Sequence, residues 1–293
     1  MNKYSIYLKA MSLALALGMV MTESLSAAVT INNSSQDLST SSSTLLAQRR
    51  GRLGFRVGGI RPSNRRTGGI SRGSFLCDGD RITTTALMPQ VEAKNEKSGK
   101  LEWIPVDATT VESSPKFLVY VSQTKKPTAT FILYKEIKDA NGKIIDDLVY
   151  EENVALTGKS GIVSISVPDD IELEMNQRYH WYFSMECNTV QSPTDTSADA
   201  SDHSYVEGWV QRIQKDPNLE TALKNAGEKG HPAVYSNNEL WIETVSSLAD
   251  LRQRYPNDRL LQDDWQSLLE SVGLERVANE TLLGSLTVVS HRN

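Results

Sequence analysis

The stretch LEMNQRYHWYFSMEC, residues 173–187, decides the fold. Tyr179, Trp181, Phe183 and Met185 occupy alternate positions in it, and the side chains of a strand point alternately to its two faces. The stretch therefore predicts a strand with one large apolar face. Its first half also has the spacing of a tyrosine corner, in which a tyrosine hydroxyl at the start of a sandwich strand bonds to the backbone upstream.

Short runs rich in β-branched and aromatic residues lie on both sides, with turn residues between them. These runs predict strands at residues 116–122, 128–137, 144–156, 163–167 and 205–213. Asn141-Gly142 suits a type I′ hairpin turn between the second and third of them. With about seven to nine strands in all, we expect a mainly β protein, an immunoglobulin-like antiparallel β-sandwich at residues 74–215.

Beyond residue 215 the hydrophobic period changes from two residues to about 3.6. Asn238 is expected to cap a helix that carries Trp241, and Asp258 to cap another that carries Trp265. Each helix has one apolar stripe, so the two are expected to pair as an α-helical hairpin. The sequence thus predicts a helical C-terminal extension, residues 216–293, packed on the sandwich. Trp241 and Trp265 are candidate binding residues on the hairpin.

The first 28 residues have the parts of a signal peptide. Lys3 and Lys9 supply positive charge, residues 10–21 are mostly apolar, and Ser26-Ala27-Ala28 suits a signal peptidase. The alternative is an uncleaved membrane anchor, but the apolar stretch is shorter than the ~20 residues that a helix needs to cross a bilayer. We therefore expect a secreted protein that is periplasmic or extracellular.

Residues 29–73 are expected to form a disordered linker rich in serine and threonine, followed by an arm rich in arginine and glycine. Eight arginines lie between residues 49 and 72 with no acidic residue among them. The arm is interpreted as binding a polyanionic envelope polymer or as lying against the acidic body of its own chain. The bland alternative is a flexible linker whose charge aids solubility. Nucleic acid is not expected, because of the predicted export. The candidate binding residues are Arg49, Arg50, Arg52, Arg56, Arg61, Arg65 and Arg66.

The chain has two cysteines, Cys77 and Cys187. Two thiols in an exported chain usually form one disulfide. Such a bridge would close a loop of ~110 residues and stabilise the fold by ~4–5 kcal/mol on the loop-entropy model. The alternative is two buried free thiols, and the absence of a C-x-x-C spacing argues against a redox role.

Catalytic motifs are weak throughout. His180, Glu186 and Glu207 are the imidazole and carboxylate candidates for a dispersed site, but no G-x-S-x-G supplies a nucleophile. The histidines have no zinc-ligand spacing, and the acidic residues 195–202 lack the pattern of a calcium loop. We expect no cofactor and no metal, and we assign no catalytic residue.

The chain resembles the cyanobacterial family known as domain of unknown function 928 in several motifs. These are Ser71-Arg-Gly73 before Cys77, Thr85-Ala-Leu-Met-Pro89, Gly161-Ile-Val-Ser-Ile-Ser166, Arg178-Tyr-His-Trp-Tyr-Phe183 with Cys187, Val206-Glu-Gly-Trp209 and Trp265-x-x-Leu-Leu-x-x-Val-Gly-Leu274. The resemblance implies a secreted sandwich protein with no assigned activity. The chain departs from the family pattern in a longer acidic loop after Cys187 and in an insertion at residues 224–231.

Three functions are compatible with these features. The preferred one is a non-catalytic interaction module that binds a protein or glycan outside the cytoplasm. The first alternative is an envelope hydrolase with a dispersed carboxylate and histidine site. The second is an assembly factor for a secreted complex, with the Trp241 and Trp265 hairpin as its docking face.

Overall fold

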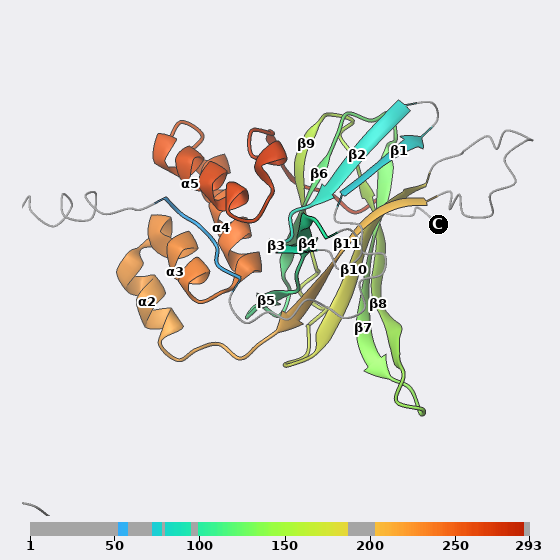
Figure 1. Ribbon diagram of the computed structural model, residues 1–293, viewed down its shortest axis with the longest axis horizontal. Coiled ribbons are helices and arrows are strands. Elements are labelled where there is room, and N and C mark those ends of the chain that lie inside the picture. The colour runs from blue at the N-terminus through green and yellow to red at the C-terminus, as the bar shows by residue number, and fades with distance from the viewer. Residues whose placement is uncertain (1–51, 58–71, 78–79, 95–98, 187–202, 290–293) are drawn as a thin grey trace, which may run out of the picture. The chain divides into compact units, whose positions relative to one another are not determined.

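The computed structural model describes residues 52–57, 72–77, 80–94, 99–186 and 203–289, and it is mainly β (Figure 1). One five-stranded sheet has the order β1 (Arg72–Cys77), β2 (Asp80–Ala86), β6 (Lys116–Val121), β9 (Gly161–Ser166) and β12 (Leu282–Ser285). The other has the order β5 (Ala108–Thr110), β11 (His203–Arg212), β10 (Arg178–Glu186), β7 (Thr128–Lys138) and β8 (Ile144–Ala155). We call them the β6 sheet and the β10 sheet. A separate hairpin joins β3 (Gln90–Lys94) to β4 (Leu101–Pro105).

The aromatic face of β10 forms the centre of the core, as its alternation predicts. Trp181 and Phe183 are fully buried. Phe117 of β6 places its ring centroid 5.1 Å from that of Trp181 and 5.7 Å from that of Phe131 on β7. Because these rings come from both sheets, the two sheets pack against each other through aromatic contacts.

Both sheets are mixed, which corrects the expectation of purely antiparallel pairing. β5 pairs parallel with β11, and β12 pairs parallel with β9. The other described pairs within the two sheets are antiparallel. β12 lies in the stretch expected to be a helical extension. The chain therefore returns from its helices to complete the edge of the β6 sheet.

The β7–β8 hairpin is confirmed, but its turn differs from the expected type I′. Gly142 has φ 76°, whereas Asn141 is not among the residues with positive φ. The Gly142 amide donates to the Asp139 carbonyl at 2.9 Å, and the Asp139 amide donates to the Lys143 carbonyl at 2.8 Å. This is a three-residue loop with glycine in the left-handed region, because type I′ would require positive φ at both central residues.

The predicted tyrosine corner has the corresponding hydrogen bond. The backbone amide of Glu174 donates to the Tyr179 hydroxyl at 2.8 Å, five residues upstream of the tyrosine. Asn176 lies between them with φ 59°, a conformation that asparagine adopts more readily than most residues. The bond fixes the connection at the point where β10 begins.

The described helices are α2 (Leu219–Ala226), α3 (His231–Asn237), α4 (Trp241–Arg254) and α5 (Arg259–Glu270), with 3-10 turns η2 (Glu228–Gly230) and η3 (Glu275–Val277). They lie together beside the sheets in Figure 1. α4 contacts β5, β6 and β12. Lys116 of β6 forms an ion pair with Asp250 of α4 at 2.8 Å. Because α4 packs against β6, Leu118, which lies on the face of β6 opposite Phe117, is also buried.

One of the two predicted helix caps is present. Asp258 caps α5 as expected, accepting from the amides of Leu260 and Leu261 at 3.0 and 3.4 Å. Asn238 does not cap α4. It follows the last residue of α3, a helix that was not predicted, and α4 begins after Leu240 without a side-chain cap.

Glu243 in the first turn of α4 is a buried carboxyl group that joins the helix to the end of β5. One of its oxygens accepts from the Thr110 hydroxyl at 2.6 Å and from the amides of Val111 and Glu112 at 2.7 and 3.3 Å. Its other oxygen is buried with no partner. Burial raises the pKa of the Glu243 carboxyl group, although these hydrogen bonds act in the opposite direction.

The predicted signal peptide and serine-rich linker lie outside the described residues, and so does Cys187. The disulfide with Cys77 therefore stays a prediction. Among the described helices, none combines the length and apolar character that a membrane crossing requires.

Candidate functional site

The side chains of β10 that alternate with its aromatic face lie on the outer face of the β10 sheet. The strand register places His180 opposite Trp209 of β11 and Tyr134 of β7. It places Tyr182 opposite Glu207 of β11. Three strands therefore bring aromatic and ionisable side chains together, although they are distant along the chain.

His180 and Glu207 form a buried pair across β10 and β11. The His180 Nε2 atom lies 2.8 Å from the Glu207 Oε2 atom, and both side chains are about 6–7% exposed. The imidazole ring is stacked on Trp209, with centroids 4.0 Å apart and an angle of 15° between the planes. The indole thus covers a pair that would otherwise face solvent.

The other nitrogen of His180 is also engaged. The Tyr182 hydroxyl lies 3.0 Å from Nδ1, and Asp146 Oδ2 of β8 lies 3.5 Å from it. In a neutral imidazole, Nε2–H donates to Glu207, and Nδ1 accepts from the Tyr182 hydroxyl. Because a general base needs a free nitrogen within reach of the substrate, this arrangement favours a role for His180 in orienting Tyr182.

Trp209 is itself held by a charged cluster. Its indole nitrogen donates to Glu136 Oε1 at 3.2 Å, and the Arg178 guanidinium lies 5.7 Å from its ring centroid. Arg178 also donates to Asp107 at 2.8 Å and forms an ion pair with Glu136 at 2.9 Å. Paired charges thus hold the indole that covers His180.

Tyr182 is the centre of three tyrosines. Its ring lies 5.8 Å from that of Tyr134 with an angle of 86° between the planes, and 5.6 Å from that of Tyr205 with an angle of 64°. Burial raises the pKa of Tyr182 and of Tyr205, and Glu207 adds to both shifts. Both hydroxyls therefore stay protonated over the physiological range and can donate hydrogen bonds.

A groove of about 580 Å³ lies over these rings, within the range of small-ligand sites. We call it the tyrosine groove. It runs over β7, β8, β10 and β11, strands that lie side by side in Figure 1. Its lining residues are Thr130, Ile132, Tyr134, Asp146, Glu151, Tyr182, Ser184 and Tyr205.

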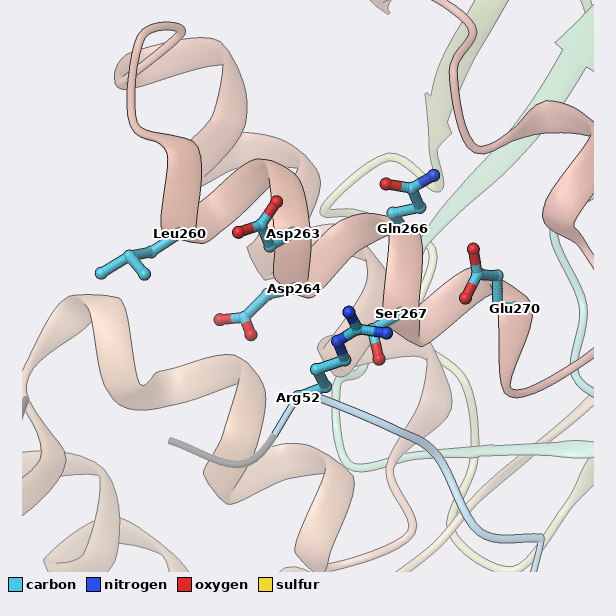
Figure 2. A pocket seen from close by; sticks show the side chains of 7 residues that line it. All are labelled: Arg52, Leu260, Asp263, Asp264, Gln266, Ser267 and Glu270. Atoms are coloured by element: carbon cyan, nitrogen blue, oxygen red, sulfur yellow. The ribbon is translucent and has the colours of Figure 1, made fainter. Parts of the chain in front are cut away.

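A second hollow of about 340 Å³ lies along α5. Figure 2 shows Arg52 reaching from an extended segment toward the helix that carries Asp263, Asp264 and Glu270. The hollow combines one cation with three carboxylates. Its charge therefore does not suit the polyanion expected for the arm.

The described arm residues, 52–57, pack against the helices. Leu53 and Phe55 are buried, and the Phe55 ring lies 5.0 Å from that of Trp241 with an angle of 77°. The Phe55 amide donates to the Ser271 hydroxyl at 2.9 Å, and the Ser236 hydroxyl donates to the Gly54 carbonyl at 2.6 Å. This part of the arm lies against its own chain, one of the alternatives that the sequence left open.

The predicted binding residues are not brought together. Arg52 and Arg56 are exposed on the packed segment, while Arg49, Arg50, Arg61, Arg65 and Arg66 lie outside the described residues. Trp241 and Trp265 are fully buried, which corrects their assignment to a docking face. Trp241 donates to the Leu87 carbonyl at 2.8 Å, so it belongs to the contact between α4 and the β6 sheet.

Of the three candidates for a dispersed catalytic site, His180 and Glu207 are in contact through Nε2 and Oε2. The side chain of Glu186 lies outside the described part of the structure. The sequence does not predict the three tyrosines as a group, although Tyr134 and Tyr182 alternate with buried residues of their strands. Within the described residues, no cluster of three or more histidine, cysteine or acidic side chains could hold a metal ion.

The family model described as Domain of Unknown Function (DUF928) matches residues 67–282. No curated protein matches the chain. The family match includes all the strands that form the tyrosine groove. It does not include the packed arm segment at residues 52–57.

Proposed function

This chain belongs to the DUF928 family, and on that premise we propose that it is a non-catalytic interaction module. It binds a protein or glycan in the tyrosine groove, outside the cytoplasm. The observation that carries the proposal is the pairing of both nitrogens of His180, with Glu207 and with Tyr182. These contacts orient a tyrosine at the groove and leave neither nitrogen as a free base.

The lining of the groove supports binding. Tyrosines supply large, rigid contact area at low cost in conformational entropy, and their hydroxyls add directional hydrogen bonds. Asp146 and Glu151 add acceptors at the same surface. A ligand with an apolar face and polar groups around it fits this combination.

The finer structural assignment is part of the same proposal. We propose that the two sheets form an immunoglobulin-like β-sandwich, supported by the aromatic contacts between them and by the tyrosine-corner bond at Tyr179. Export through the signal at residues 1–28 would place the module in the periplasm or outside the cell. A bridge between Cys77 and Cys187 would suit that oxidising compartment.

Binding can be tested with the purified full-length chain on arrays of envelope glycans and of peptides. We expect retention of at least one of these classes and a loss of retention in Tyr205→Leu, which removes a ring from the groove. Tyr255→Leu is the matched control, because it replaces a partly exposed tyrosine after α4. No retention of any probe, or an equal loss in both variants, contradicts the proposal.

A hydrolase is the second candidate, and the 2.8 Å contact between His180 and Glu207 is the observation that favours it. Chromogenic glycosides and esters provide the test. Turnover that is abolished in Glu207→Gln, with an unchanged circular dichroism spectrum, would support hydrolysis. No turnover by the unmodified chain, or unchanged turnover in the variant, contradicts it.

A further inference from the structure

We propose that the tyrosine groove takes a positively charged ammonium group. This inference rests on the proposed function, since it names the chemistry of the ligand that the groove binds. Three features carry it: the angles between the tyrosine rings, the charge of the lining, and the neutralisation of the nearest cation.

The three rings line the groove at different inclinations. Tyr182 is nearly perpendicular to Tyr134 and is inclined by 64° to Tyr205. A cation is attracted to the face of an aromatic ring, and sites for quaternary ammonium groups use several such faces around the charge. A flat sugar ring would instead be favoured by one broad aromatic platform.

The charged side chains of the lining are acidic. Asp146 and Glu151 line the groove, and none of its lining residues is basic. Within the described part of the chain, Glu151 makes no ion pair with a lysine or an arginine. Negative charge at the rim lowers the energy of a bound cation and raises that of an anion.

The charged groups next to the groove do not make its surroundings positive. The His180–Glu207 pair carries one negative charge with a neutral imidazole and no net charge with an imidazolium. Arg178 is the cation on the same face of β10, and it contacts two carboxylates, Asp107 and Glu136. A bound ammonium group would therefore meet no uncompensated positive charge among these residues.

Choline and 3,3-dimethyl-1-butanol are the decisive pair of probes, because the alcohol has the shape of choline without its charge. Titration calorimetry on the full-length chain should show choline binding about tenfold more tightly than the alcohol. Nα-acetyl-lysine methylamide, tested alongside, distinguishes a quaternary ammonium group from the primary ammonium of a protein side chain. Preferential binding of either cation over the neutral probe supports the proposal.

Two variants test whether the preference for a cation depends on a charge in the groove. Glu151 is exposed, so Glu151→Gln should fold normally and weaken choline binding by about twofold to fivefold. Glu172→Gln, at an exposed acid outside the groove, is the matched control and should bind as the unmodified chain does. Equal effects of the two variants would overturn the assignment of the cation to the groove.

The outcomes separate this inference from the proposed function. If choline and its neutral isostere bind equally, or if a neutral glycan binds while no cation does, the ammonium proposal fails and the binding module stands. If no probe binds and no array ligand is retained, both proposals fail.

Discussion

Replacing the buried carboxyl group of Glu243 should change how stability depends on pH. Its pKa is raised in the folded chain, so the native state keeps a proton that the unfolded state has already lost. The resulting stability is fully present below the pKa of the unfolded chain and is lost as pH rises through the folded pKa. Glu243→Gln removes this titration. The stability of the glutamine variant relative to the unmodified chain should therefore increase from pH 4 toward pH 7.

The magnitude follows from the three hydrogen bonds that Glu243 accepts. Glutamine keeps a carbonyl oxygen for these donors, and we expect its stability at neutral pH to lie within about 1 kcal/mol of the unmodified chain. Glu243→Ala removes the acceptor. It should cost about 1–3 kcal/mol for the buried Thr110 hydroxyl and about 1 kcal/mol for the two partly exposed amides, or about 2–4 kcal/mol in total.

Urea unfolding followed by tryptophan fluorescence across this pH range gives the comparison. Glu172→Gln, which changes an exposed acid that is not among the groups acting on the Glu243 pKa, controls for a general effect of losing one negative charge. A difference between the Glu243→Gln variant and the unmodified chain that stays flat with pH would refute the reasoning. So would a glutamine variant as unstable as the alanine variant.

Other features yield simpler predictions. Gly208→Ala should destabilise the fold by about 1–3 kcal/mol in urea unfolding, because the added methyl group would lie 2.8 Å from the Trp181 indole. Phe55→Ala should release the packed arm segment, which we expect to appear as faster trypsin cleavage at its two arginines. If the proposed disulfide forms, mass spectrometry of the non-reduced chain should recover Cys77 and Cys187 in one linked pair of peptides.

Controls and contrary outcomes are available for each. Gly54→Ala has ordinary van der Waals space, with the new methyl group 3.7 Å from the Ser271 side chain, and should be nearly neutral in both the unfolding and the trypsin experiments. A Gly208→Ala protein as stable as its parent would contradict the contact at Trp181. Unchanged trypsin cleavage of Phe55→Ala would mean that the ring does not hold the arm. Free thiols at both cysteines, alkylated without reduction, would exclude the bridge.

The longer strands could be predicted because each carries its own alternating pattern. Trp181 and Phe183 lie on the apolar face that the spacing predicts, and both are buried in the core. β12 could not be predicted in the same way, since its four residues include a glycine and show no period. Its parallel partner β9 is also distant in the sequence, and so no local signal records the pairing.

The candidate site was predicted only in parts. Residue type makes His180 and Glu207 candidates for a dispersed site, and their side chains lie 2.8 Å apart. What the sequence does not contain is the register between β10 and β11, because the two strands are far apart along the chain and no two-residue hairpin motif sets their pairing. That register places Glu207 beside Tyr182 and makes the tyrosine groove.

The position of β12 has a consequence for the timing of folding. β1 and β12 are the opposite edges of one sheet, yet one lies before nearly every other element and the other after all the helices. A nascent chain cannot complete that sheet until residue 285 has left the ribosome, and contacts over such long separations form slowly. The unfinished edge of β9 is then open to pairing with another chain, so partly synthesised chains are expected to associate through this edge until β12 covers it.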